Sequence, residues 1–507
     1  MKSTAAMLMI ITIFSKIVGY GRDRLMAYYF GTGPVGGALV IAATIPTVLF
    51  GMIASGIATG FIPTYARIRT EHDEHAADRF TSNLVNLLFA LTTAIVVLGL
   101  VFTKEIVYVF APGFTVEREM TIFLTRFVIV TLYGTAWGSV FQGYLQIHGE
   151  FTAPALIGFL LNAFVILGMF LTSKTGSLVF VGMGFLLGGI LQYLIFIPSL
   201  KRSGYRHQMI FEPKDPNFSH LFAIGLPVIL GVAVNDINIL IDKSIASVIS
   251  TAGVVSLNYG YKIFGFVTGI VVTSISTTVY PSLVESAEAS DTTHMKKVFG
   301  EAIVGMSLCI LPAMAGIALY SEDIVHLLFH GGEFGAEAVR DTATALFFYG
   351  LGLLGFGIRD IAGKSFYAMH EAKVPMQNAF WVVGVNITLN LILSQLMGIG
   401  GLAFASALSI MFGAWLMTKK LRERIGPLGL TRLMKNILRI ACATAIMGGT
   451  GFFVRRYLGM HMSVNKAFFL TMIYSMLSYG AVILLMKIDG MDEFRQSLRQ
   501  KLFLRGK

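Results

Sequence analysis

Phe61-Ile62-Pro63-Thr64-Tyr65 ends one long apolar stretch, and Val279-Tyr280-Pro281-Ser282-Leu283 ends another about 218 residues later. The segment Val107–Phe114 is echoed by Val325–Gly332 at about the same offset. A third echo pairs one set of residues with another in the same order: Tyr144, His148 and Pro154 with Tyr367, His370 and Pro375. Three ordered matches predict that the chain contains two homologous halves. In a membrane protein, a duplicated helical bundle puts the substrate site where the repeats meet, which favours a transporter.

The composition indicates a membrane protein. Hydrophobic residues make up 55% of the chain, charged residues only 13%, and the mean hydropathy is +0.73. A soluble protein carries roughly a quarter charged residues. Many apolar runs reach the roughly 20 residues that a helix needs to cross about 30 Å of hydrocarbon, and they lack the alternation of β-barrel strands. We therefore predict an all-α polytopic membrane protein.

The apolar runs predict about fourteen transmembrane helices, in two pseudo-repeated six-helix lobes followed by two C-terminal helices. The expected spans are 7–30, 36–64, 83–103, 121–146, 154–172, 177–200, 220–249, 253–283, 298–320, 340–368, 375–397, 400–418, 437–457 and 465–487. The expected divisions are an N-lobe (1–203, spans 1–6), a cytoplasmic linker (204–219), a C-lobe (220–420, spans 7–12), spans 13–14 (421–490) and a basic cytoplasmic tail (491–507).

Lys and Arg in the loops predict the orientation. They favour one side by roughly three to one, which places both termini in the cytoplasm. The net charge of +11 then reflects orientation and attraction to anionic lipid head groups. Nucleic acid is not an expected partner, because no soluble domain could carry a basic face. Cys309 and Cys442 fall inside spans and are expected to be buried thiols.

Ionisable residues within spans are the candidate substrate contacts, because a charge at mid-membrane costs at least about 2.5–3.5 kcal/mol and usually faces a wet cavity or a partner. The first span carries Lys16, Arg22 and Asp23, the eighth carries Lys262, and the tenth carries Arg359. The first-span patch would form a cationic wall for an anionic substrate, Lys262 is expected to face a cavity, and Arg359 is a further candidate. For the first span the alternative is a short helix that ends near residue 21 with snorkelling side chains.

Two separate groups of polar residues within spans are candidate cation ligands. Asp242 lies in the seventh span, Asn386 and Asn390 lie one helical turn apart in the eleventh, and Ser406 lies in the twelfth. Amide and hydroxyl oxygens are hard ligands that suit a small cation. Interhelical hydrogen bonding is the alternative for the amides, and an ion pair with Lys243 is the alternative for Asp242.

Enzymatic chemistry is not expected. The chain has no Walker motif, no HExxH, no CxxC and no GxSxG. ATP is therefore not expected to drive transport directly, and no cofactor is predicted beyond the candidate small cation.

Together these residues resemble the MurJ/MviN family, the lipid II flippases of the multidrug/oligosaccharidyl-lipid/polysaccharide exporter superfamily. The resemblance rests on Phe14–Asp23 in the first span, Ile62-Pro63 in the second, Ala111–Phe114 after the third, and Pro281–Leu283 closing the eighth. It covers nearly the whole chain and includes two helices added after a six-plus-six core.

The resemblance implies a flippase that carries undecaprenyl-pyrophosphate-linked peptidoglycan precursor from the inner to the outer leaflet of the bacterial inner membrane, in cell-wall synthesis and cell shape. It implies a central cationic cavity, a groove for the lipid tail made by spans 13 and 14, a sodium site on spans 7, 11 and 12, and cell-wall synthesis proteins as partners. This chain departs from the family where the second-span arginine falls on Phe50 or Gly51. The alternatives are an exporter of another lipid-linked polysaccharide or amphiphile, or a non-transporting scaffold of the cell-wall machinery.

Overall fold

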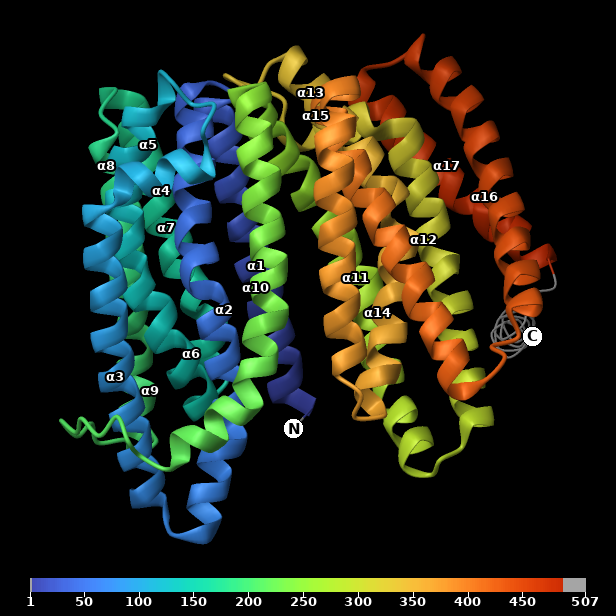
Figure 1. The fold of residues 1–507 in the computed structure, drawn as a ribbon. Helices are drawn as coiled ribbons and strands as arrows, with labels where there is room; N and C mark the ends of the chain where they lie inside the picture. Colours follow the sequence, from blue (N-terminus) through green and yellow to red (C-terminus); the bar gives the residue numbers. More distant parts are fainter. Residues whose placement is uncertain (1, 487–507) are drawn as a thin grey trace. The chain divides into compact units, whose positions relative to one another are not determined.

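The computed structural model describes residues 2–486, with side chains from residue 14 onward (Figure 1). The predicted basic tail, 491–507, lies outside the described residues, as does the end of the predicted last segment. The described chain is helical, and its one isolated β-bridge joins Gly331 to Phe334. The helices are α1 (Lys2–Phe30), α2 (Pro34–Glu71), α3 (Glu74–Val101), α4 (Thr103–Phe110), α5 (Glu117–Val128), η1 (Ile129–Thr131), α6 (Leu132–Ile147), α7 (Thr152–Thr175), α8 (Val179–Leu191), η2 (Gln192–Ile195), α9 (Phe196–Arg202), α10 (Asn217–Ile249), α11 (Thr251–Glu288), α12 (Thr292–Phe329), α13 (Ala336–Leu351), α14 (Leu353–Ala368), α15 (Lys373–Ile425), α16 (Leu430–Gly459) and α17 (Val464–Leu485).

The helices account for the fourteen predicted spans. Eleven are long and apolar enough to cross a membrane alone, and α13 with α14, bent by 44°, makes a twelfth. Helix α15 would be about 80 Å long if straight, more than twice the hydrocarbon thickness. It breaks at Gly398 (φ 57°, ψ −130°), so it supplies two spans. Helix α1, with charges in its second half, supplies the remaining one.

The two Pro-containing motifs lie inside helices and do not end them. Pro63 lies within α2, which continues to Glu71, and Pro281 lies within α11, which continues to Glu288. Proline removes a backbone donor and bends a helix without necessarily ending it. The apolar stretch ends at these motifs, and the helix continues beyond them into a more polar segment. The alternative of a first helix that ends near residue 21 is ruled out, because α1 reaches Phe30, where the first span was predicted to end.

The chain divides into two compact units. The first comprises Met1–Val255 with Phe329–Ala338, and the second comprises Ser256–Leu328 with Val339–Lys507. Helix α10 thus packs with the first unit, although the sequence repeat begins with it. The predicted lobe boundary at 204–219 concerns the repeat, and it stays a prediction.

In the first unit, α10 packs closely along α2. A Cβ atom on Gly56 of α2 would lie 2.3 Å from Ile229 Cγ1, and one on Gly225 of α10 would lie 2.7 Å from the Gly56 carbonyl oxygen. Small residues at a crossing let two helix backbones approach, which drives association where lipid supplies no hydrophobic force. An aromatic core lies near one end of the unit, where Tyr65 contacts Tyr144 edge-on with ring centroids 5.6 Å apart.

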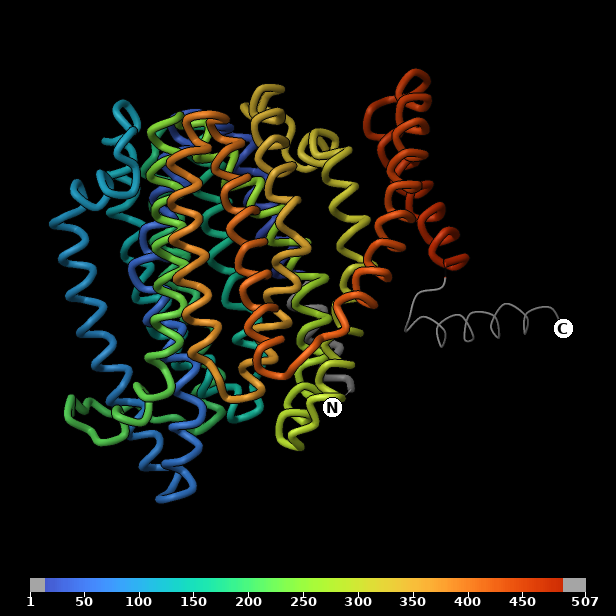
Figure 2. The backbone as a smooth tube through the Cα atoms, turned by 45° about the vertical axis from the view of Figure 1, so that its right-hand side comes forward, coloured from blue at the N-terminus to red at the C-terminus, as the bar shows by residue number. Residues whose placement is uncertain are grey.

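In the second unit, α16 and α17 pack side by side and against α12 (Figure 2). Buried Val304, Ile440 and Ile483 join the three helices, and the Tyr479 hydroxyl donates to the Leu308 carbonyl at 2.7 Å. Cys309 and Cys442 are free and exposed, so the expected burial of both thiols is wrong. In a membrane protein, a small apolar side chain such as that of cysteine can be exposed on a helix because it faces lipid.

Two loops of the first unit show the predicted repeat. The backbone N–H of Gly113 donates to the Ser247 hydroxyl at the end of α10, at 3.2 Å. In the matching loop, the Glu333 N–H donates to the Tyr28 carbonyl near the end of α1, at 2.9 Å. A Cβ atom on Gly113 would lie 2.2 Å from the Ser247 carbonyl oxygen, and one on Gly332 would lie 2.2 Å from that of Tyr28. Each loop therefore lies against the first helix of the other repeat.

A second pair of turns refines the sequence alignment. In the turn between α6 and α7, the Glu150 N–H donates to the carbonyl five residues before it at 2.8 Å, and Glu371 does the same between α14 and α15 at 2.9 Å. The preceding residue has a positive φ in both turns: 76° at Gly149 and 59° at His370. The structure therefore pairs His370 with Gly149, whereas the sequence paired it with His148.

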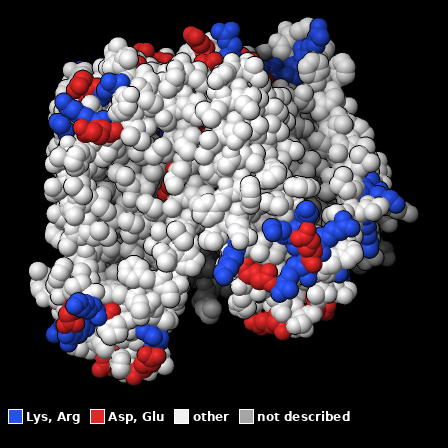
Figure 3. All heavy atoms as spheres, in the orientation of Figure 1, with Lys and Arg blue, Asp and Glu red and all other residues white. Residues whose placement is uncertain are grey.

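On the face shown in Figure 3, most charged side chains gather toward the helix ends of each unit, and the middle is covered mainly by uncharged side chains. This distribution is that of a protein whose central band faces hydrocarbon. The charges described below are exceptions, because they lie within the spanning helices.

Candidate functional site

The polar patch of α1 lies in a continuous helix of the first unit. Lys16 is exposed, and Arg22 forms an ion pair with Asp23, with Nη2 2.9 Å and Nε 3.2 Å from Oδ1. The pair keeps 27% and 14% side-chain exposure. Two guanidinium atoms therefore bond a carboxylate, and the remaining N–H donors of Arg22 stay available for other contacts.

Helix α1 is held against α7 by small residues. A Cβ atom on Gly19 would lie 3.5 Å from Asn162 Nδ2, and one on Gly158 would lie 3.5 Å from Ser15 Oγ. Phe14 and Phe159 stack beside them with ring centroids 5.8 Å apart. This packing fixes the rotation of α1, and with it the faces that carry Lys16 and Arg22.

The second unit contains its own intramembrane cations. Lys262 of α11 is half-buried, with Nζ 5.4 Å from the ring centroid of the buried Tyr259. An aromatic face stabilises an ammonium group that has left water. Lys364 of α14 lies 3.7 Å from Asp360 and donates to Ser276. Lys262 and Lys364 are thus stabilised by neighbours within one unit.

Arg359 is tied into the packing of α14 against both halves of α15. Its Nε donates to Asn378 Oδ1 at 2.9 Å, and Asn378 Nδ2 donates to the Gly413 carbonyl at 2.9 Å. Asn378 is 2% exposed. The side chain predicted to bind substrate is therefore hydrogen-bonded to Asn378, which itself joins the two halves of α15.

The amides of α15 form a buried network with hydroxyls of its second half. Asn386 Nδ2 lies 3.3 Å from both Ser406 Oγ and Ser409 Oγ, and Asn390 Nδ2 donates to Asn386 Oδ1 at 2.8 Å. Interhelical hydrogen bonding, the alternative named from the sequence, is therefore present. Asp242, the fourth predicted ligand, belongs to α10 of the first unit, where Asn238 Nδ2 lies 3.3 Å from it.

Asp236 is a residue that the sequence analysis did not single out. It is 6% exposed, on the face of α10 that packs on α2, and a Cβ atom on Gly51 would lie 3.6 Å from its Oδ2. Gly51 is one of the two positions on which the family's second-span arginine falls. The sequence indicates Asp236 only through its place in the polar run Asn235–Lys243. Only the fold shows that, within this run, it is the Asp236 carboxyl that contacts α2.

An apolar groove of about 480 Å³ lies between α12 and α16 in the second unit. Its lining is Leu311, Ala315, Ala318 and Leu319 from α12, and Ala441, Thr444, Ala445, Gly448, Gly449, Phe452 and Phe453 from α16. The sequence analysis expected a groove made by spans 13 and 14. In the structure, span 13 lines this groove together with span 9.

An ion pair joins the two helices beyond the groove. Arg455 of α16 and Asp323 of α12 form two hydrogen bonds, Nη2–Oδ1 at 2.6 Å and Nε–Oδ2 at 3.0 Å. One turn earlier in α12, Tyr320 leaves helical geometry (φ −129°, ψ 21°). A Cβ atom on Gly451 would lie 2.8 Å from the Tyr320 hydroxyl, so the helices meet closely at this level.

Comparison with known proteins identifies the family. The family model "Lipid II flippase MurJ" matches residues 26–473. The chain belongs to the lipid II flippase MurJ family. "Probable lipid II flippase MurJ" of Rickettsia prowazekii (strain Madrid E) is 26% identical over 412 residues, which are 80% of this chain and 81% of the relative. "Lipid II flippase MurJ" of Burkholderia cenocepacia (strain ATCC BAA-245 / DSM 16553 / LMG 16656 / NCTC 13227 / J2315 / CF5610) is 24% identical over 423 residues, 82% of each chain.

Solved structures agree on the fold. The inward closed conformation of a lipid II flippase MurJ matches with a TM-score of 0.80 and 23% identity, over 95% of this chain and 98% of that one. An inward-facing multidrug resistance MATE family transporter of the MOP superfamily matches with a TM-score of 0.70 and 16% identity, over 81% and 95%. The all-helical, two-lobed fold with two added C-terminal helices is confirmed, and this member of the MurJ family is a multi-pass membrane transporter.

Proposed function

We propose that this protein flips lipid II from the inner to the outer leaflet of the bacterial inner membrane by alternating access. The observation that carries the proposal is the family match over residues 26–473, which includes most of both repeats, all of α16 and the beginning of α17. The intramembrane cations supply the physical support. A polyprenyl-pyrophosphate head group is anionic, and it needs compensating charge where bulk water is excluded.

In this proposal, Lys16 and Arg22 of the first unit and Lys262 of the second unit each supply positive charge to the pyrophosphate. The planar guanidinium group of Arg22 can donate paired hydrogen bonds to phosphate oxygens, whereas the two lysines act as point charges. Asp23 holds the Arg22 guanidinium in place at 2.9 Å. Any net charge that moves with the substrate couples transport to the membrane potential, at about 2.3 kcal/mol per charge per 100 mV.

The groove between α12 and α16 suits the hydrocarbon tail. Its lining is apolar except for Thr444, and four alanines with Gly448 and Gly449 leave room along it. A tail that stays in such a groove remains in hydrocarbon throughout, so only the head group must pass the membrane interior. This assigns the tail to spans 9 and 13.

The loop charges favour an orientation with both termini in the cytoplasm. Proteins of the cell-wall synthesis machinery are proposed partners, because the flipped precursor must be consumed on the other side of the membrane. No enzymatic step is proposed for the chain itself.

We also propose that Na⁺ binds at the amide and hydroxyl cluster of α15. Asn386, Asn390 and Ser406 are 1%, 0% and 8% exposed and offer neutral oxygen ligands of the type that Na⁺ accepts. The ion would add a fixed positive charge to the second unit and favour whichever conformation binds it more tightly.

Lipid II flipping by purified protein in proteoliposomes tests the main proposal. Lys16→Gln, Arg22→Gln and Lys262→Gln should each lower the rate at least tenfold, because each removes a charge that the head group needs. Lys174→Gln is the matched control, since Lys174 lies over the Phe170 ring, 5.8 Å from its centroid, near the end of α7. If these three variants retained the parent rate, the proposed role of the cations would be wrong.

A further inference from the structure

The segment between α9 and α10, residues 203–216, is an extended linker bound along the side of α3. Asn86 Nδ2 donates to the carbonyls of Gln208 and Ile210 at 2.9 and 2.8 Å. Asn83 makes a two-point contact with Glu212: it donates to its carbonyl at 2.9 Å and accepts from its N–H at 2.8 Å. The backbone of 208–212 is therefore satisfied by side chains of one helix face, and its path is fixed.

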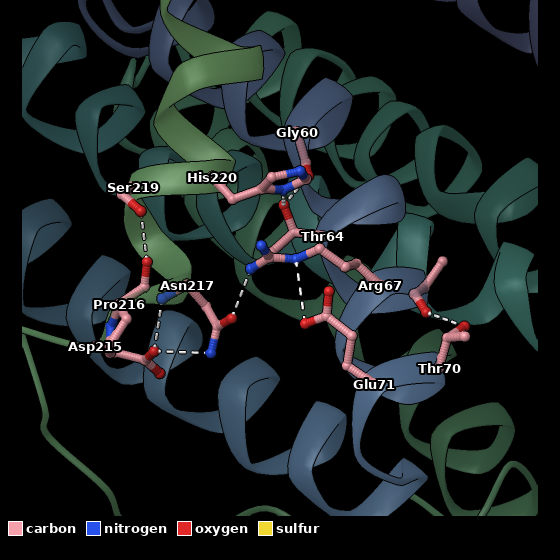
Figure 4. Close-up of polar contacts among 11 residues, drawn as sticks. Gly60, Thr64, Arg67, Thr70, Glu71, Asp215, Pro216, Asn217, Ser219 and His220 are labelled. Atoms are coloured by element: carbon pink, nitrogen blue, oxygen red, sulfur yellow. Dashed lines mark hydrogen bonds and ion pairs between the residues drawn. The ribbon is translucent and has the colours of Figure 1, made fainter.

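Both ends of the linker are fastened to the first unit. Tyr205 packs edge-on against Tyr144 with ring centroids 5.1 Å apart, and its hydroxyl lies 3.0 Å from Ser82 Oγ. At the other end, Asn217 Oδ1 accepts from Arg67 Nη2 at 2.8 Å (Figure 4). The linker thus keeps one face on α3 and cannot turn its side chains over.

The opposite face of the linker presents large apolar side chains. Met209 is 91% exposed and Phe211 is 62% exposed, although each lies between residues that are hydrogen-bonded to α3. Two such side chains on a fixed backbone in water would be an unfavourable surface patch. Their cover must come from outside the described fold.

The position along α3 indicates what that cover is. Exposed apolar side chains cover α3 from Phe89 to Val101, and charged Arg79 precedes them. From Arg79 to Val101 the helix is about 33 Å long at 1.5 Å per residue, close to the hydrocarbon thickness of about 30 Å. Asn83 and Asn86 lie about 6–11 Å inward from Arg79, so the linker runs along one edge of the hydrocarbon layer.

The charges around the apolar pair select the lipid. Exposed Lys201, Arg202, Arg206 and Lys214 lie on or beside the linker. Of its two acids, Glu212 pairs with Arg79 at 2.7 Å and Asp215 accepts from Asn217 at 2.9 Å. Basic side chains beside a membrane surface attract anionic head groups.

We infer that the linker is an interfacial lipid-binding surface: Met209 and Phe211 insert into the edge of the acyl layer, and the four basic residues hold anionic phospholipid head groups around them. The assignment of this surface to the cytoplasmic leaflet rests on the orientation given in the proposed function. The depth to which Met209 and Phe211 insert does not depend on that orientation. The surface would fix the depth of the first unit in the membrane while the transporter cycles.

Site-directed labels in nanodiscs that contain phosphatidylglycerol and phosphatidylcholine test the inference. Met209→Cys and Phe211→Cys would carry spin labels in a Cys309→Ala/Cys442→Ala background, with His72→Cys, in the turn between α2 and α3, as the aqueous control. Labels at 209 and 211 should collide more with oxygen than with a polar nickel reagent, and the label at 72 should show the reverse. Labels at 209 and 211 that match the control, or that neither reagent reaches because a second copy covers them, would overturn the inference.

Head-group selectivity is tested separately. A fluorophore at position 211 should be quenched at least twofold more by nitroxide-labelled phosphatidylglycerol than by nitroxide-labelled phosphatidylcholine at equal mole fraction. Replacing Lys201, Arg202, Arg206 and Lys214 with Gln should bring that ratio to one while the oxygen preference persists. A ratio of one in the parent protein would refute the anionic-lipid surface. Neither readout depends on lipid II, so a failure of the flipping proposal would leave both results unchanged.

Discussion

The ion pair between Arg455 and Asp323 should hold α16 against α12, and Asp323→Asn tests its strength. Two short hydrogen bonds join the side chains, which are 19% and 18% exposed. Breaking a fully buried pair costs about 3–5 kcal/mol, because a charge is left without compensation, and exposed pairs contribute about 0–1 kcal/mol. For a pair about four-fifths buried, we expect a loss of about 2 kcal/mol, roughly a thirtyfold change in the unfolding equilibrium.

The assay is the free energy of unfolding of the purified protein, measured in a double-mutant cycle with Arg455→Gln. The coupling energy should be about 2 kcal/mol, so the double variant should be little worse than either single one. Glu301→Gln is the matched control on the same helix, since its pair with Lys297 is 4.0 Å apart and more than half exposed. Single losses no larger than that of the control, or strict additivity, would refute the reasoning.

Two further outcomes are expected. Gly449→Leu should block the groove between α12 and α16 and lower lipid II flipping several-fold without unfolding the protein. Gly480→Leu on α17 is its control, because an added Cβ meets no other atom within 4 Å at either site; equal rates in the two variants would rule out a role for the groove. If Na⁺ binds the α15 cluster, Na⁺ should raise the thermal stability of the parent more than K⁺ does, and Asn390→Ala should abolish that difference; a difference that survives the substitution would place the ion elsewhere.

The sequence predicted the spans and the repeat well because both are recorded in local patterns. Hydropathy identifies the segments that lie in the hydrocarbon layer, so the fourteen spans could be placed. It does not show where a helix ends. That is why the second span was predicted to end at residue 64, although α2 continues to Glu71. A proline followed by charged residues occurs both where a helix ends and where a helix continues out of the bilayer, so the sequence cannot distinguish these two cases.

Contacts between residues far apart in the chain could not be predicted from the sequence, for a different physical reason. Asp236 and Asp242 occur in one polar run, and only the packing of α10 on α2 shows that Asp236 meets Gly51. Likewise Asn83 and Asn86 read as polar residues near the start of a span, whereas the fold uses them to bind the linker backbone. An amide pairs equally well with a backbone, an ion or another amide, so its partner is decided by the fold.

Two loops, each packed on the first helix of the other repeat, help to explain which segments of the chain make up the first unit. The loop at Gly113 lies against α10, the first helix of the second repeat, and the loop at Gly332 lies against α1, the first helix of the first repeat. Each contact needs a residue without a Cβ atom and joins a loop to a helix more than 100 residues away, so each is long-range. A repeat that packed only on itself would leave both loops with their own halves. Phe329–Ala338 belongs to the first unit because its loop lies on α1, and α10 belongs to it because α10 packs along α2 and carries the Gly113 loop, although both segments come from the second repeat. The compact unit and the sequence repeat therefore describe different properties of the chain: one records what packs together, and the other records what was duplicated.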